Sequence, residues 1–194
     1  MISHTRPALV GALAAALFAA TPAAASTPDA AGPYTWTVEK GHVLACAGEE
    51  GELRVDVELY ENSAFGTHVQ VSVRTAEAEY VRGGETDGGL FDNGTISRRL
   101  VVQPQPERAG ASQTVDINGT YALTGPRERV HEVYDEPFGQ VVSKGWRTPM
   151  SAAVTVSALG QQVDLACDPA FAFDLKVRRP AGTPTADPEA NLAR

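Results

Sequence analysis

One segment of the sequence, Gly125 to Met150, combines residue types that are well suited to binding. It reads GPRERVHEVYDEPFGQVVSKGWRTPM, and its candidate ligand-binding residues are Arg127, Arg129, His131, Tyr134, Trp146 and Arg147. Aromatic rings offer apolar contact, and an arginine guanidinium donates charged, forked hydrogen bonds to carboxylate or phosphate groups. The combination is typical of a site for sugars, peptides or an anionic cell-wall polymer. The alternative interpretation is structural, with the rings capping one end of the fold and the arginines solvated.

Motifs of specific enzymes are missing from the sequence. It contains no G-x-S-x-G nucleophile elbow, no S-x-x-K followed by K-T-G, and no nucleotide-binding glycine pattern. The run from His131 to Asp135 differs from the H-E-x-x-H zinc motif in having aspartate at the second histidine position. We therefore assign no catalytic residue, no cofactor and no metal ligand. A metal site remains open only if the fold brings His42, His68 and His131 together.

The composition excludes several classes of protein. The chain has 194 residues, of which 43% are hydrophobic and 21% charged, which suits one folded domain and argues against a disordered chain. Lysine and arginine number 16 against 24 acidic residues, giving a formal charge of −8. An acidic protein repels the phosphate backbone, so we expect no nucleic-acid partner.

The first 25 residues have the features of a secretory signal peptide. Arg6 supplies the positive charge, residues 8–20 are uninterruptedly apolar, and three alanines precede Ser26. We expect cleavage after Ala25 and a secreted protein without a stable membrane anchor; a retained N-terminal anchor is the alternative.

Residues 26–33 and 180–194, rich in proline, alanine and small polar residues, are expected to be disordered. The chain has 13 arginines and 3 lysines and is rich in alanine, which is typical of a bacterium with a GC-rich genome.

The two cysteines predict one disulfide, Cys46–Cys167, because secreted proteins retain disulfides and the sequence has no metal-type C-x-x-C spacing. Each cysteine follows a leucine by two residues, so in extended chain Leu44 and Leu165 share a face with them. The role predicted for the bridge is structural.

Elsewhere the apolar residues alternate with polar ones, as in strands with one solvated face. Leu53 to Tyr60 is the clearest example, and similar runs end near Val38, Val73, Leu123, Ala158, Cys167 and Val177. Turn-forming glycines separate the runs, and Trp146 falls in a loop-like setting. We predict a single all-β domain over residues 34–179, a β-sandwich of immunoglobulin-like architecture with about eight to ten antiparallel strands, with a barrel as the second choice.

Two classes of function are compatible with these features. The first is a non-enzymatic extracellular binding or interaction module for a cell-wall polymer or a protein. The second is an extracellular hydrolase whose paired carboxylates are brought to within about 5–10 Å by the fold. We favour the first, because the sequence has a candidate binding segment and no catalytic motif. The sequence leaves the ligand, the oligomeric state and the biological role open.

Overall fold

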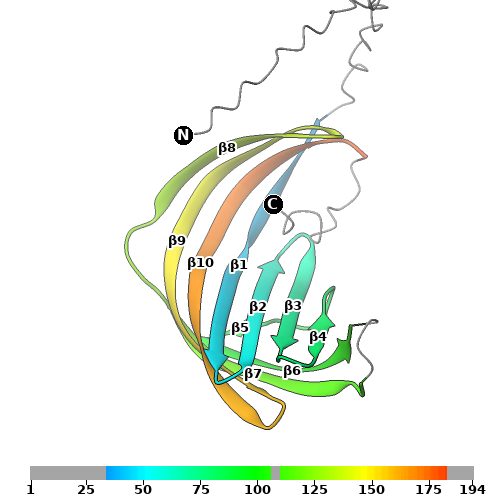
Figure 1. The fold of residues 1–194 in the computed structure, drawn as a ribbon. Helices are drawn as coiled ribbons and strands as arrows, with labels where there is room; N and C mark the ends of the chain where they lie inside the picture. Colours follow the sequence, from blue (N-terminus) through cyan, green and yellow to red (C-terminus); the bar gives the residue numbers. More distant parts are fainter. Residues whose placement is uncertain (1–33, 106–109, 183–194) are drawn as a thin grey trace, which may run out of the picture. The chain divides into compact units, whose positions relative to one another are not determined.

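The computed structural model describes residues 34–105 and 110–182, and in these ranges the chain forms strands and no helices (Figure 1). The predicted signal peptide, residues 26–33 and residues 183–194 of the predicted tail lie outside the described residues. Within the described ranges, no helix is long and apolar enough to cross a membrane. The strands are β1 (Tyr34–Glu50), β2 (Leu53–Asn62), β3 (Gly66–Arg74), β4 (Glu79–Arg82), β5 (Phe91–Asp92), β6 (Thr95–Pro104), β7 (Gln113–Leu123), β8 (Glu128–Glu136), β9 (Gly139–Ala158) and β10 (Gln161–Pro180).

Every strand pairing is antiparallel, and the pairings form a continuous ring. The order is β10-β1-β2-β3-β4-β6-β7-β9, and β9 pairs in turn with β10. The all-β prediction of eight to ten antiparallel strands is confirmed. The sheet combines features of both predicted architectures, because two β layers pack face to face while long strands pass from one layer to the other.

The core lies between these layers and comes from the alternation seen in the sequence. Val55, Val57 and Leu59 of β2 are at most 1% exposed, and they belong to the same buried cluster as Val115 and Ile117 of β7. Burying an aliphatic side chain of this size contributes roughly 1.5–3 kcal/mol each, so this cluster is the main source of stability. The other fully buried members include Leu44, Val69, Val71, Val73, Ile96, Val102 and Val156.

The predicted disulfide is confirmed. Cys46 of β1 and Cys167 of β10 lie directly opposite each other, and their sulfur atoms are bonded. Leu44 and Leu165 are buried on the same side, as their spacing predicts. The bridge therefore links the first and last strands of the domain, which are already neighbours through hydrogen bonds.

Four strands, β8, β9, β10 and β1, lie side by side as curved ribbons in Figure 1. Three of them, β1, β9 and β10, are the longest strands, with 17, 20 and 20 residues. The segment around Trp146, expected to be loop-like, is part of β9. Sequence alternation is weak there because polar and apolar residues occur on both faces. Two glycines allow close strand contacts: a Cβ atom on Gly41 would lie 1.7 Å from the Glu61 carbonyl oxygen, and one on Gly145 would lie 2.1 Å from that of Asp174.

Candidate functional site

The pairing of β1, β10, β9 and β8 arranges the side chains of one face in three rows. Directly opposite residues on antiparallel strands point to the same face, as do residues two apart along a strand. In the order β1, β10, β9, β8, the first row is Trp36, Arg178, Val142 and Val133, the second is Val38, Lys176, Lys144 and His131, and the third is Lys40, Asp174, Trp146 and Arg129.

This face gathers positive charge. We call it the cationic face and define it by these twelve residues together with Arg127, which adjoins the third row. It holds six lysine and arginine side chains and one histidine, against the single acid Asp174. All three lysines of the whole chain, Lys40, Lys144 and Lys176, lie on it. A protein with a formal charge of −8 therefore has a concentrated positive surface on one sheet.

The centre of the cationic face lacks internal charge compensation. Lys176 and Lys144 are directly opposite each other, and His131 is opposite Lys144 on its other side. Within residues 34–105 and 110–182, none of these three side chains, nor Arg129, makes a hydrogen bond or an ion pair. Like charges placed directly opposite each other on a sheet are destabilising. Folding alone does not explain this arrangement.

Charge is partly compensated at one edge of the face, around Asp174. The Asp174 carboxylate lies 3.4 Å from Lys40 Nζ and 3.8 Å from an Arg127 Nη atom. The Arg127 guanidinium in turn lies over the Trp146 ring, 5.2 Å from its centroid. These contacts hold Arg127 and Trp146 together, as the sequence hypothesis requires. All the ion-paired side chains are about half exposed, so the pairs contribute little to stability.

Large apolar side chains stand among the cations. Trp36 is 52% exposed, Val38 55%, Val133 51% and Trp146 43%. Exposed rings beside arginine and lysine resemble the compositional pattern of binding surfaces, where aromatic residues and arginine are enriched.

Arg178 contributes a cation that is held in place by neighbours. One of its terminal nitrogens donates to Gln140 Oε1 at 3.2 Å, and its guanidinium lies over the Tyr34 ring at 4.5 Å. Its buried Nε has no hydrogen-bond partner among the described residues. The guanidinium is thus fixed next to Trp36 and retains an unused donor.

The predicted binding residues divide between the two faces of the β8–β9 hairpin. Arg127, Arg129, His131 and Trp146 lie on the cationic face. Tyr134 and Arg147 lie on the reverse face, where Arg147 donates to both Glu132 carboxylate oxygens at 2.8 and 3.0 Å, and Tyr134 donates to Glu132 as well. Burial, followed by the hydrogen bond to Glu132, raises the pKa of Tyr134. These two residues therefore stabilise the hairpin from behind.

The reverse face also contains a buried ion pair that sequence reasoning missed. Glu39 is 3% exposed and pairs with Arg179, whose guanidinium lies over the Phe65 ring. The Glu39 carboxylate also accepts hydrogen bonds from Thr37 Oγ1 at 2.8 Å and Asn62 Nδ2 at 3.0 Å. A fully hydrogen-bonded buried charge rigidifies its surroundings. β1, β2 and β10 are thereby tied together behind the cationic face.

The three histidines are not brought together. His131 is on the cationic face, His68 of β3 contacts Tyr60, and His42 lies next to the core between the Phe91 and Tyr121 rings. In the described part of the chain, no group of three or more histidine, cysteine, aspartate or glutamate side chains is arranged to hold a metal ion.

His42 is instead a partly buried residue that packs against aromatic rings. Its ring stacks on Phe91 at 4.7 Å, and its Nδ1 lies 3.8 Å from Glu61, beyond hydrogen-bond distance. Burial lowers the pKa of His42, although the Glu61 carboxylate partly offsets the effect. The other carboxylate oxygen of Glu61 accepts a hydrogen bond from the Leu90 backbone N–H at 2.8 Å.

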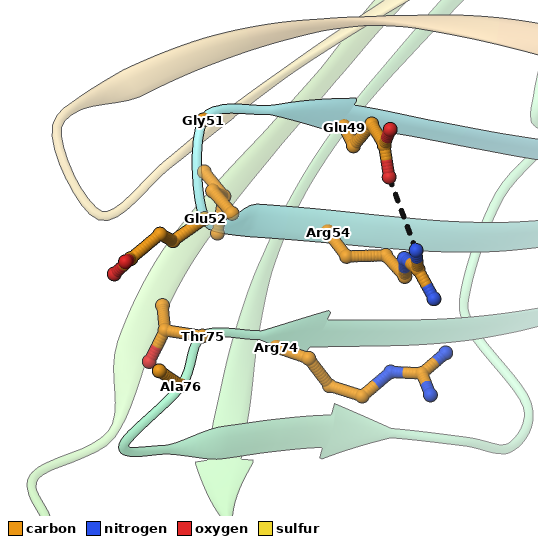
Figure 2. Close-up of a pocket in the computed structure, with 8 residues that line it drawn as sticks. Glu49, Gly51, Glu52, Arg54, Arg74, Thr75 and Ala76 are labelled. Carbon is orange, nitrogen blue, oxygen red and sulfur yellow. Dashed lines mark hydrogen bonds and ion pairs between the residues drawn. The ribbon is translucent and has the colours of Figure 1, made fainter.

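Two hollows of the surface lie outside the cationic face. One, of about 350 Å³, lies beside the β1–β2 and β3–β4 turns. Glu49 forms an ion pair with Arg54 at 3.1 Å, drawn as a dashed line in Figure 2. In the same view, the Glu52 side chain points away from Arg54 and Arg74. The glutamates of this turn are exposed, which matches ordinary solvated surface charge.

A second basic region surrounds a hollow of about 420 Å³ beside β6, with Arg82, Arg98 and Arg99 in its lining. Here two of the three arginines have partners within the chain. Arg98 donates to Thr86 and to the Asp87 carbonyl, and Arg99 pairs with Asp116 at 2.6 Å. The cationic face differs from Arg98 and Arg99 because its central lysines make no side-chain hydrogen bond or ion pair in the described part of the chain.

The residues that sequence reasoning missed on the cationic face, Trp36, Val38, Lys40, Lys176 and Arg178, come from the two ends of the chain. One weak signal did exist: Lys40 and Lys176 each lie in or directly beside a run in which apolar and polar residues alternate. The chain matches no family model, and neither a curated protein nor a solved structure is similar to it, so the interpretation of the cationic face depends on its own residues.

Proposed function

We propose that the protein is a non-enzymatic extracellular binding module that holds an anionic polymer of the cell envelope on its cationic face. Secretion is part of this proposal; the Cys46–Cys167 disulfide and the signal-like first 25 residues support it.

The observation that carries the proposal is the row of uncompensated cations at the centre of the face. Lys176, Lys144 and the neighbouring Arg129 make no side-chain hydrogen bond or ion pair in the described part of the chain. Beside β6, by contrast, Arg99 pairs with Asp116, and Arg98 donates to a hydroxyl and a backbone carbonyl. An anionic ligand would supply the missing compensation.

The shape of the face favours a polymer over a small molecule. Its residues are spread over four neighbouring strands, and most of them are exposed. Small-molecule ligands are usually enclosed by a concave pocket. An extended chain that lies across several strands would contact many cations at once, each contact being weak and sensitive to salt.

Binding to purified anionic cell-wall polymer tests the proposal. The Lys144→Gln/Lys176→Gln variant removes two central charges, and Arg54→Gln/Arg74→Gln removes the same number of charges from the surface of β2 and β3. We expect the unaltered protein and the arginine variant to bind at low salt and to be released at high salt. The lysine variant should bind at least about tenfold more weakly, a loss of about 1.4 kcal/mol of binding free energy. Equal affinities for the two variants, or no binding by the unaltered protein, would overturn the proposal.

A further inference from the structure

The cationic face contains a diagonal on which a cation stands between two tryptophans. Trp36 is opposite Arg178, and Lys176 is two residues from Arg178 along β10 on the same face. Lys176 is in turn opposite Lys144, two residues from Trp146 along β9. Trp36, Lys176 and Trp146 are therefore successive diagonal neighbours on three adjacent strands.

Diagonal neighbours on a sheet are about 7–8 Å apart, so the two tryptophans are attached to the sheet about 15 Å from each other, with the lysine midway. Both rings are about half exposed, and Lys176 has no partner in the described part of the chain. One sugar ring or one phosphate is too small to contact all three groups. The diagonal therefore fits a chain of repeated units.

The spacing also distinguishes between kinds of anionic ligand. A bare polyanion such as inorganic polyphosphate would use the lysines and leave the tryptophans without a role. A lipid surface needs a continuous apolar face to insert. Here Trp36 and Val38 are neighbours along β1, but Arg178, Lys176 and Lys144 occupy the positions between them and the other exposed apolar side chains, Val133 and Trp146.

We infer that the ligand is an acidic polysaccharide, in which a charged group bound by Lys176 is flanked by sugar rings that stack on Trp36 and Trp146. This inference rests on the proposed function and specifies its ligand. The flat apolar face of a ring provides contact area for the sugar, and the ammonium group provides the charge contact. Arg127, which lies over the Trp146 ring, helps to fix the orientation of that ring.

The experiment compares two polyanions on the intact protein: hyaluronan, which alternates carboxylate-bearing and neutral sugars, and inorganic polyphosphate. The variants are Trp36→Leu, Trp146→Leu and Lys176→Gln, with Val101→Ala on β6 as the control at an exposed apolar position outside the cationic face. Leucine keeps an apolar side chain but removes the flat ring. Circular dichroism and the unfolding midpoint establish that each variant is folded.

We expect each tryptophan variant to weaken hyaluronan binding about three- to tenfold and to leave polyphosphate binding within about twofold, because the stacking contact is lost and the charges remain. Lys176→Gln should weaken both, and Val101→Ala neither. Hyaluronan fragments too short to contact both rings should bind more weakly than long chains.

The outcomes separate the two claims. If the tryptophan variants bind hyaluronan as well as the unaltered protein does, or lose both polymers equally, the polysaccharide inference is wrong while the binding function stands. If the unaltered protein binds neither polymer, both claims fail.

Discussion

Lys176 of β10 lies directly opposite Lys144 of β9, on the same face, and neither side chain has an acidic partner in the described part of the chain. Opposing like charges on a sheet are unfavourable. A fold selected for stability alone would place an acid or a neutral side chain at one of the two positions. The pair therefore has the character of a functional site that costs some stability.

The repulsion between Lys176 and Lys144 predicts that one substitution has opposite effects on the stability of the fold and on the affinity for an anionic polymer. Lys176→Gln should raise the free energy of unfolding by a few tenths of a kcal/mol, up to about 1 kcal/mol, because it removes the repulsion from Lys144. The same variant should bind an anionic polymer more weakly. Urea denaturation at low ionic strength measures the first effect. A variant that is less stable than the unaltered protein would show that Lys176 has a structural role.

The Cys46–Cys167 bridge should contribute about 2–5 kcal/mol to stability, because it closes a loop with a sequence separation of 121 residues. The Cys46→Ser/Cys167→Ser variant should therefore unfold at a clearly lower denaturant concentration under oxidising conditions. Adding a reductant should lower the midpoint of the unaltered protein and leave that of the variant unchanged. Equal midpoints for the two proteins in the absence of reductant would argue against a stabilising bridge.

Gly41 should tolerate no side chain. An added Cβ would lie 1.7 Å from the Glu61 carbonyl oxygen and 2.9 Å from the Phe173 ring, so β1 and β2 would have to separate. We expect Gly41→Ala to destabilise the fold by about 3 kcal/mol, at the upper end of overpacking effects. Gly110 is the matched control, since its added Cβ would meet atoms no closer than 3.5 Å. Similar thermal midpoints for Gly41→Ala and Gly110→Ala would contradict the close approach.

His42 should make the protein less stable in acid. Burial lowers its pKa in the folded protein from the ordinary value of 6.5, so the unfolded chain binds more protons in the window between the two values. The stability contributed by neutral His42 is present above pH 6.5 and is lost as the pH falls through this window. The free energy of unfolding, measured from pH 7.5 downwards, should therefore decrease on acidification.

The His42→Phe variant keeps an aromatic ring beside Phe91 and Tyr121 but cannot titrate, so this part of the pH dependence should disappear. His131→Gln alters an exposed histidine and should keep it. If His42→Phe has the same pH dependence as the unaltered protein, another group is responsible.

The local structure was predictable because alternation is a local property of the sequence. The run from Leu53 to Tyr60 reads directly as a strand with one buried face, and the leucine before each cysteine marks the inner side of β1 and β10. The disulfide followed from having only two cysteines in a chain with a signal-like N-terminus. These inferences need no knowledge of which strands are neighbours.

The cationic face was only partly predictable, because it depends on strand order. Trp146 and Arg129 were found as members of one sequence segment, but Lys40 and Lys176 are added by the pairing of β1 with β10 and of β10 with β9. The same segment also contains Arg147, whose side chain points to the reverse face because it is one residue from Trp146. A segment-level reading of composition cannot separate the two faces of a strand.

Protection of the lysines from acetylation tests the central claim most directly, because all three lysines of the chain lie on the cationic face. The intact protein is treated with a limiting amount of an acetylating reagent, with and without saturating anionic cell-wall polymer, and each lysine is quantified by mass spectrometry. The proposal predicts that Lys144 and Lys176 are protected most strongly and that Lys40, beside Asp174, is protected less. Bound polymer with unchanged acetylation of Lys144 and Lys176 would contradict it.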